Sequence, residues 1–281
     1  MRTPFSAPVV IDGYFSSPEG QVLTPSALST PPDPRLIESR QPFSLEGYTR
    51  PSDLPVAIST QSAHVIDATY LRCLDMPLRL AGTDSYHLPE EWSDLAPLLT
   101  EIIEVEHGHN PHWVDYHTYL TIDCRDVRAE EQQRRGGLHV DGFQGERINP
   151  KTKITRNYVL TTNGGTRFYP QSFTVVDPAC FNVFQGFDLQ AQEPVIAPEG
   201  IVHFMDAYTV HESGLASRDG RRTFLRLTYD LKIFDRAGNT HNSMLDYEWE
   251  MVDRDVHSTV TTPTARNLQD PSAVIYFAQS A

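Results

Sequence analysis

Two residues near the middle of the chain have the types and the spacing to bind a transition-metal ion. His139 and Asp141 stand in the stretch Gly-Gly-Leu-His-Val-Asp-Gly-Phe, which holds the one His-x-acid match of the sequence. Residues two apart on a β-strand face the same side, so an imidazole and a carboxylate can bind one ion from a single strand. With one distant histidine they would form the facial triad of non-haem Fe(II) sites, which leaves three coordination positions open for a co-substrate and dioxygen. The pattern predicts an oxygen-activating iron site.

The third ligand should lie on a later strand, near the end of the first. His211 stands in Thr-Val-His-Glu-Ser-Gly, just after an apolar run and at the kind of rim where metal ligands usually lie. His203 lies inside the apolar run Ile-Val-His-Phe-Met, which is more typical of a core histidine. The predicted metal ligands and catalytic residues are therefore His139, Asp141 and His211.

Six segments after residue 116 are rich in Val, Ile, Thr, Tyr and Phe and are separated by Gly, Pro and Asp turn signals, as β-strands are. Closely spaced strands after a helix predict a mainly β fold with flanking helices, specifically a double-stranded β-helix or jelly roll of the cupin-like kind. The expected strands cover His117–Cys124, Ile154–Thr162, Phe173–Val176, Phe181–Phe187, Ile201–Met205 and Arg222–Phe234.

The rest of the chain is expected to surround this core. Leu and Ile recur with helical spacing from Pro89 to about Val105, which predicts a helix packed outside the sheet. Ten of the 21 prolines fall in the first 60 residues, so a wrapping arm of extended segments, with apolar groups at 9–11 and 56–58, is expected there. We expect one domain over 1–281, with the arm at 1–75, the jelly-roll core at 117–234, and a polar C-terminal extension, as a tail or lid, at 235–281.

The stretch from His139 to Asp230 resembles the core of the Fe(II)/2-oxoglutarate-dependent oxygenase superfamily, and its spacing is most similar to the taurine dioxygenase and phytanoyl-CoA hydroxylase groups. In those groups an arginine about eleven residues after the distal histidine binds the far carboxylate of 2-oxoglutarate. The resemblance implies this role for Arg222, with Thr166, after a Gly-Gly turn, holding the same carboxylate. Arg226 matches a second arginine that binds an acidic substrate in taurine dioxygenase. Halogenating relatives replace the acid of the motif with a small residue, whereas Asp141 is retained here.

The two arginines also have a physical interpretation of their own. Arg222 and Arg226 are four residues apart, so they project from the same face of the expected strand. Buried guanidinium groups are costly unless they are paired with anions, and a clamp on a dicarboxylate would supply one. Alternatively, one of them pairs with an internal acid such as Asp206 or Asp230, and the two arginines could exchange roles.

The resemblance implies a non-haem iron dioxygenase that uses Fe(II), 2-oxoglutarate and dioxygen on a small molecule. Arg226 predicts a carboxylate-bearing substrate, such as an amino acid or a specialised metabolite. Hydroxylation is the default outcome, although desaturation, cyclisation or epimerisation can follow from the same chemistry. The remaining candidates, each of which could equally be a core residue, are Tyr158 for the co-substrate and Phe143, Gln144 and Phe168 for the substrate.

The composition bounds the other partners. With 37 acidic and 23 basic residues, the chain has a formal net charge of −14, which disfavours a nucleic-acid partner. No apolar run is long enough to cross a membrane, and no signal peptide is recognisable, so a cytoplasmic location is expected. The N-terminal arm could reach a partner subunit, which leaves a homo-oligomer open. The cysteines are far apart and are expected to be free thiols: Cys73, Cys124 and Cys180.

Two other interpretations of these residues stay open. In the first, the chain is a cupin-type metalloenzyme that does not use 2-oxoglutarate, and Arg222 pairs internally. In the second, it is a non-catalytic β-sandwich binding module with incidental histidines. Conversion of 2-oxoglutarate to succinate separates the first from an oxygenase, and metal analysis tests the second.

Overall fold

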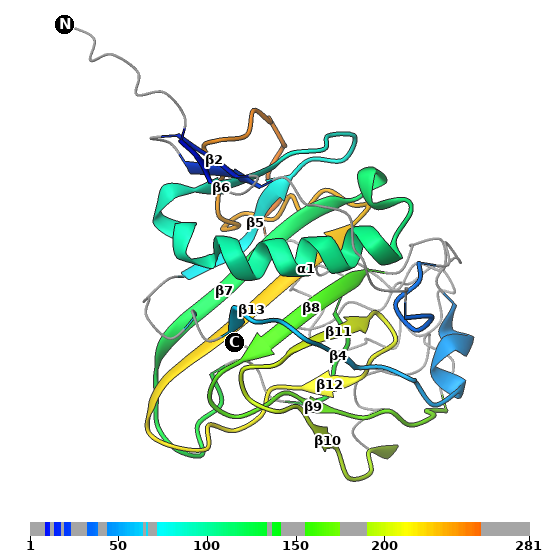
Figure 1. Ribbon diagram of the computed structural model, residues 1–281. Coiled ribbons are helices and arrows are strands. Elements are labelled where there is room, and N and C mark those ends of the chain that lie inside the picture. Colours follow the sequence, from blue (N-terminus) through cyan, green and yellow to red (C-terminus); the bar gives the residue numbers. More distant parts are fainter. Residues whose placement is uncertain are drawn as a thin grey trace, which may run out of the picture.

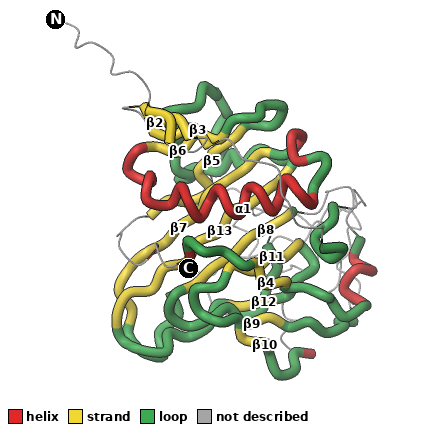
Figure 2. The backbone as a smooth tube through the Cα atoms, viewed as in Figure 1, coloured by secondary structure: helices red, strands yellow, loops and turns green. Residues whose placement is uncertain are grey.

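The structure is a computed structural model in which antiparallel β-sheets dominate, with few helices (Figures 1 and 2). In no part of the chain that it describes is a helix both long and apolar enough to span a bilayer. The described residues are 9–11, 14–17, 20–23, 33–38, 44–63, 66, 72–133, 137–141, 155–174 and 190–253.

The larger sheet forms the centre of the molecule, and all of its neighbouring strands are antiparallel. The longest strands, β7 and β13, pair along their whole length, and β8 lies on the other side of β13. In order across the sheet, the strands are β4 (Val56–Ile58), β11 (Val202–Asp206), β8 (Arg156–Thr161), β13 (Gly220–Asp230), β7 (His117–Val127) and β5 (Arg72–Arg79).

A second, smaller sheet consists of very short strands. Its order is β10 (Val195–Ile196), β9 (Arg167–Phe168) and β12 (His211–Glu212), and an isolated bridge joins His139 to His211 at its edge. From β7 to β13 the chain passes back and forth between the two sheets. This alternation, with β11-β8-β13-β7 in one sheet and β10-β9-β12-His139 in the other, is the strand order of a double-stranded β-helix. It confirms the predicted fold class.

The two faces of the larger sheet have different roles. On β13, Leu225, Leu227 and Tyr229 belong to the main hydrophobic core, which also holds the buried residues of the long helix. Phe224 points to the opposite face, where it packs on a second cluster with Phe168 of the smaller sheet. The helix therefore covers the outer face of the larger sheet (Figure 1). The inner face of the larger sheet is the one turned toward the smaller sheet.

The predicted helix is present, with a different start and end. A 3-10 segment, η3 (Glu90–Leu95), leads into α1 (Ala96–His109), so helical structure begins at residue 90 and continues four residues beyond the expected end. A proline in the first turn of α1 costs no intrahelical hydrogen bond, because that amide has no partner in a helix. Two other 3-10 segments are η1 (Leu45–Thr49) and η4 (Trp113–Asp115).

The N-terminal segments are extended, as predicted for residues 9–11 and 56–58. β4 joins the edge of the larger sheet, next to β11. The strands of the separate sheet are β1 (Val9–Ile11), β2 (Tyr14–Ser17), β3 (Gly20–Leu23) and β6 (Tyr86–Pro89). The division of the chain into arm, core and extension stays a prediction.

Some strand predictions differ from the structure. Phe173 is not in a strand; its amide donates to the Tyr48 carbonyl instead. The expected strand at 181–187 lies outside the described residues, as does Cys180. Cys73 and Cys124 are buried free thiols, as expected.

Candidate metal centre

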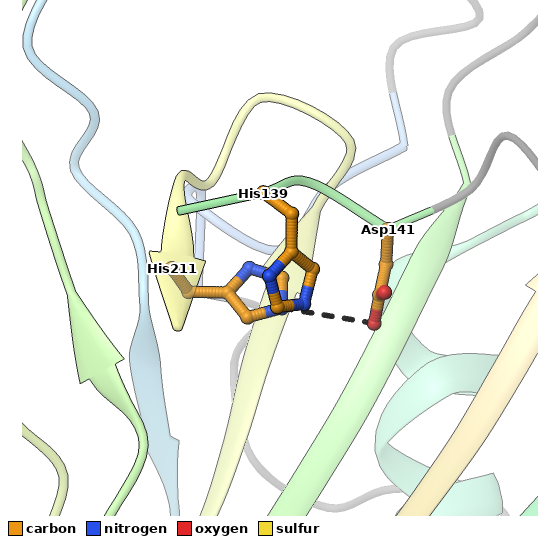
Figure 3. Close-up of side chains that lie close together, drawn as sticks. All are labelled: His139, Asp141 and His211. Atoms are coloured by element: carbon orange, nitrogen blue, oxygen red, sulfur yellow. Dashed lines mark ion pairs between the residues drawn. The ribbon is translucent and has the colours of Figure 1, made fainter. Parts of the chain in front are cut away.

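The three predicted ligands meet at one point between the sheets (Figure 3). One ligand atom from each of His139, Asp141 and His211 can be chosen so that all three lie within 4.8 Å of one another. His211 Nε2 lies 3.8 Å from Asp141 Oδ2, and the two imidazole rings are 4.5 Å apart between centroids. Two imidazoles and one carboxylate at this separation can bind a single cation as a facial triad.

Backbone pairing explains why these side chains converge. His139 and His211 are directly opposite each other, and their amides donate to each other's carbonyls, both at 2.9 Å. Opposite residues of an antiparallel pair project from the same side of the sheet. Asp141 is two residues beyond His139, so it returns to that side. The bridge thus brings together ligands that are 72 and 70 residues apart in the chain.

In both imidazoles, the Nδ1 atom is hydrogen-bonded to a backbone carbonyl. His139 Nδ1 lies 3.0 Å from the Gly137 carbonyl, and His211 Nδ1 lies 2.8 Å from the Thr209 carbonyl. A carbonyl only accepts, so Nδ1 carries the proton and donates in each ring. The lone pair is then on Nε2, which is the nitrogen that faces Asp141 in His211 (Figure 3). Such hydrogen bonds fix the ring orientation and the tautomer of metal-binding histidines.

The charge states at the triad suit a metal ion. Burial lowers the pKa of His211 to about 4, and the neighbouring His139 contributes in the same direction, so His211 is neutral near pH 7. Burial by itself would raise the pKa of Asp141. The adjacent Arg226 guanidinium and the two imidazoles outweigh it and hold that pKa below its usual range. A neutral imidazole and an ionised carboxylate are the forms that bind a divalent cation.

His203, the alternative third ligand, is a core histidine. It is on β11, 6% exposed, and its Nδ1 lies 3.0 Å from the Ile201 carbonyl. Among the described residues, the group that can hold a metal ion contains His211 and not His203. Phe168 lies between the two histidines, with its ring centroid 5.9 Å from that of His203 and 6.1 Å from that of His211.

Arg226 is in direct contact with the triad. Its Nη1 donates to Asp141 Oδ2 at 2.6 Å, and its Nη2 donates to Asp75 Oδ1 at 3.1 Å. This is the internal pairing that the sequence left open, although the acids are Asp75 and Asp141, whereas Asp206 binds its own turn and Asp230 binds Thr155. The contacts of Arg226 give no support to its predicted role on a substrate carboxylate.

Asp75 is a site residue that sequence reasoning missed. It lies at an irregularity in the β5–β7 pairing and has a φ of 47°, which is unusual for a residue other than glycine. Thr121 fixes it from β7: the hydroxyl donates to Asp75 Oδ1 at 2.9 Å and accepts from the Asp75 amide at 3.0 Å. Bulges of this kind re-aim side chains next to active sites. The available signal was a lone acid in the apolar stretch Cys-Leu-Asp-Met.

Arg222 lies on the inner face of β13 and is 1% exposed. Its guanidinium donates to Ser213 Oγ at 3.2 Å and to the Gly164 carbonyl at 3.0 Å. Ser213 is two residues beyond His211, so the Cα atoms of these two residues are at most about 7 Å apart. Arg222 therefore contacts a residue close in the chain to one of the predicted ligands. Gly164 is two residues before Thr166. Arg222 therefore contacts the turn that leads to Thr166 and the segment that follows His211.

The turn beside Arg222 requires glycine. Gly164 has a φ of +78°, and a Cβ there would lie 2.0 Å from the Leu215 carbonyl oxygen. A Cβ on Gly165 would lie 1.8 Å from the Ala197 carbonyl oxygen. Larger residues would push apart the loops that carry Thr166 and Ser213, so the Gly-Gly pair sets the shape of this end of the site.

Tyr158 was predicted to contact the co-substrate, and the structure corrects this. It is fully buried on the outer face of β8, where its hydroxyl donates to Glu106 Oε2 of α1 at 2.7 Å. The inward residue is its neighbour Asn157, whose Oδ1 accepts from Thr228 on β13. Phe168 is 0% exposed, so it packs behind His211 within the core. Phe143 and Gln144 lie outside the described residues.

No family model and no curated protein matches the sequence. Among solved structures, the chain is similar to the non-haem α-ketoglutarate-dependent carbocyclase SnoK from nogalamycin biosynthesis, with 18% identity, 51% of this chain and 59% of that chain covered, and a TM-score of 0.33. For AviO1 from Streptomyces viridochromogenes Tue57 the identity is 14%, the coverage 69% and 95%, and the TM-score 0.37. For EvdO2 from Micromonospora carbonacea var. aurantiaca, complexed with 2-oxoglutarate, the identity is 13%, the coverage is 47% of this chain and 59% of that chain, and the TM-score is 0.28.

Proposed function

We propose that the chain is a non-haem, Fe(II)- and 2-oxoglutarate-dependent oxygenase that acts on a small molecule. The observation that carries this proposal is the triad of His139, Asp141 and His211, with its ligand atoms within 4.8 Å of one another. Each imidazole uses Nδ1 on a backbone carbonyl, so each has Nε2 available for an ion. A set of three protein ligands leaves positions for a chelating co-substrate and dioxygen.

The donor set fits Fe(II), and the residues around it fit 2-oxoglutarate. His139, Asp141 and His211 would hold the ion, and Arg222 with Thr166 would hold the far carboxylate of the co-substrate. A carboxylate is a stronger acceptor for a buried guanidinium than the hydroxyl and carbonyl that Arg222 now contacts. When bound, Fe(II) and 2-oxoglutarate would supply, together with dioxygen, an oxidant strong enough for an unactivated C–H bond, with succinate and carbon dioxide as co-products.

The protein's own part is to bind and to orient. Arg226, held by Asp75, fixes the Asp141 carboxylate through Oδ2, the oxygen that lies 3.8 Å from His211 Nε2. Phe168 packs next to His211, with the two ring centroids 6.1 Å apart. The predicted carboxylate-bearing substrate rested on Arg226, whose two partners are now both internal. Hydroxylation as the default outcome stays a prediction.

The test is conversion of 2-oxoglutarate by the purified protein with Fe(II) in air. The proposal expects succinate and carbon dioxide to form in equal amounts without an added substrate, slowly, and only with Fe(II). His211→Ala should abolish this turnover, and His112→Ala, a histidine in a turn away from the triad, should retain it. Absence of succinate from protein that binds Fe(II) would instead favour a cupin-type metalloenzyme that does not use 2-oxoglutarate.

A further inference from the structure

A cavity of about 540 Å³ lies on the inner side of the larger sheet, at its β5 edge. Its walls come from β5 and from the segment at 234–251, which follows β13. This volume is within the range of small-molecule sites. None of the described strands of the smaller sheet lines this cavity. The segment at 234–251 forms the wall opposite β5.

The cavity is next to the metal centre. Asp75 is part of its wall, and Asp75 Oδ1 accepts from Arg226 Nη2 at 3.1 Å. The other arm of the same guanidinium donates to the metal ligand Asp141 at 2.6 Å. One guanidinium group therefore separates the cavity wall from the triad. Phe234, another wall residue, stacks on Tyr119 of β7 at 4.0 Å between ring centroids.

The C-terminal wall is fastened to the sheet. Thr240 pairs with Leu74 in both directions: its amide donates to the Leu74 carbonyl at 2.8 Å, and its hydroxyl accepts from the Leu74 amide at 3.0 Å. Asn242 is 0% exposed, and its side-chain amide donates to the carbonyls of Pro77 and His87. A fully satisfied buried amide holds a segment in one place. The wall is thus a built part of the fold.

The chemical character of the cavity favours a cation. Tyr247 and Trp249 present aromatic rings with centroids 4.4 Å apart, and Glu248 presents an exposed carboxylate, whereas the Asp75 carboxylate is already paired with Arg226. None of the described residues that line it is a lysine or an arginine. Aromatic faces and carboxylates together attract ammonium groups, and the net charge of −14 adds to this attraction at long range.

We propose that this cavity binds the substrate of the iron site, and that the substrate is a ring-bearing small molecule with a protonated amine. The ring stacks on Trp249 and Tyr247, and the ammonium group is directed to the Glu248 carboxylate. This inference rests on the proposed function, and it replaces the carboxylate-bearing substrate expected from Arg226.

The experiment compares two probes of similar shape, tryptamine and indole-3-acetate, on the full chain loaded with Mn(II), which is paramagnetic. Ligand-observed NMR measures the affinity of each probe, and the extra relaxation of its protons relative to Zn(II)-loaded protein reports proximity to the ion. We expect tryptamine to bind more tightly and to show strong Mn(II)-dependent relaxation. Equal or tighter binding of indole-3-acetate would overturn the proposal, and so would tryptamine binding without that relaxation.

Variants of the cavity sharpen the test. Glu248→Gln should weaken tryptamine binding about two- to fivefold, and Trp249→Ala about five- to thirtyfold. Glu250→Gln, an equally exposed acid two residues along that is not in the wall, should change nothing. Identical affinities in all these variants would overturn the assignment of the cavity. Failure of Mn(II) to bind would contradict the proposed function as well, whereas Mn(II) binding without a preference for tryptamine contradicts this inference alone.

Discussion

Replacing Arg222 by methionine should greatly weaken 2-oxoglutarate binding and leave the metal site intact. Methionine keeps most of the aliphatic stem, so the packing on the inner face of β13 changes little. The guanidinium, which is 1% exposed and reaches the loops of Gly164 and Ser213, is lost. Arg222 contacts none of the three metal ligands in the described hydrogen bonds and ion pairs, so metal affinity should stay close to wild type.

The expected magnitude follows from the burial of this group. A hydrogen bond to a charged partner contributes roughly 1.5–3 kcal/mol, and a guanidinium can donate two to one carboxylate. Two bonds at the lower end of that range give about 3 kcal/mol. Since each 1.4 kcal/mol corresponds to a factor of ten, the dissociation constant of 2-oxoglutarate should rise about a hundredfold.

The assay is calorimetric titration of 2-oxoglutarate into Mn(II)-loaded protein, in which no turnover occurs. Arg221→Met is the matched control, because Arg221 is adjacent on the same strand but faces the other side. Arg222→Lys keeps the charge without the planar fork and should fall between wild type and Arg222→Met. Thermal unfolding of each variant checks that the fold is retained.

Unchanged affinity in Arg222→Met would refute this reasoning. If affinity were lost in Arg226→Met and retained in Arg222→Met, the two arginines would have exchanged roles, which the sequence left open. Because Arg226 is paired with Asp75 and Asp141, we expect the affinity to be lost in Arg222→Met.

Three further predictions concern stability. Arg226→Met should lower the free energy of unfolding of the metal-free protein by about 3–5 kcal/mol, because it leaves the buried Asp75 and the partly buried Asp141 without their cation. Mn(II) should restore part of this stability, and a loss that is the same with and without Mn(II) in denaturant titrations would contradict the prediction. Tyr158→Phe should cost about 1–3 kcal/mol through Glu106 and leave 2-oxoglutarate affinity unchanged, whereas a loss of that affinity would return Tyr158 to the site. Burial lowers the pKa of His107, His117 and His211 to about 4. Between about pH 6.5 and 4 only the unfolded chain binds protons at these residues, so the free energy of unfolding of the metal-free protein should fall as the pH falls through this window. A stability that does not change with pH in this window would contradict the prediction.

The grouping of His139, Asp141 and His211 could be predicted from the sequence because its signals are local. The spacing of two predicted that His139 and Asp141 lie together, although His139 forms an isolated bridge in place of the expected strand. The position of His211 after an apolar run marks the rim of a sheet. The alternation of β13 also predicted correctly that Arg222 and Arg226 share one face. These inferences need only the period of a strand, which holds wherever a strand forms.

The remaining features depend on long-range register. Every residue of β8 is buried, so no polar alternation shows that Asn157 faces inward and Tyr158 outward. Asp75 meets Arg226 across 151 residues through an irregular pairing of β5 with β7, which no local pattern encodes. The strands of the smaller sheet have two residues each, which is too short for a periodic signal.

The most direct test of the central claim is an equilibrium titration with Mn(II), followed by electron paramagnetic resonance of the free ion. The account predicts one tightly bound Mn(II) per chain, abolished in Asp141→Ala and in His211→Ala and retained in His112→Ala. Tight binding that survives both of the first two substitutions, or no tight binding in the wild-type protein, would contradict it.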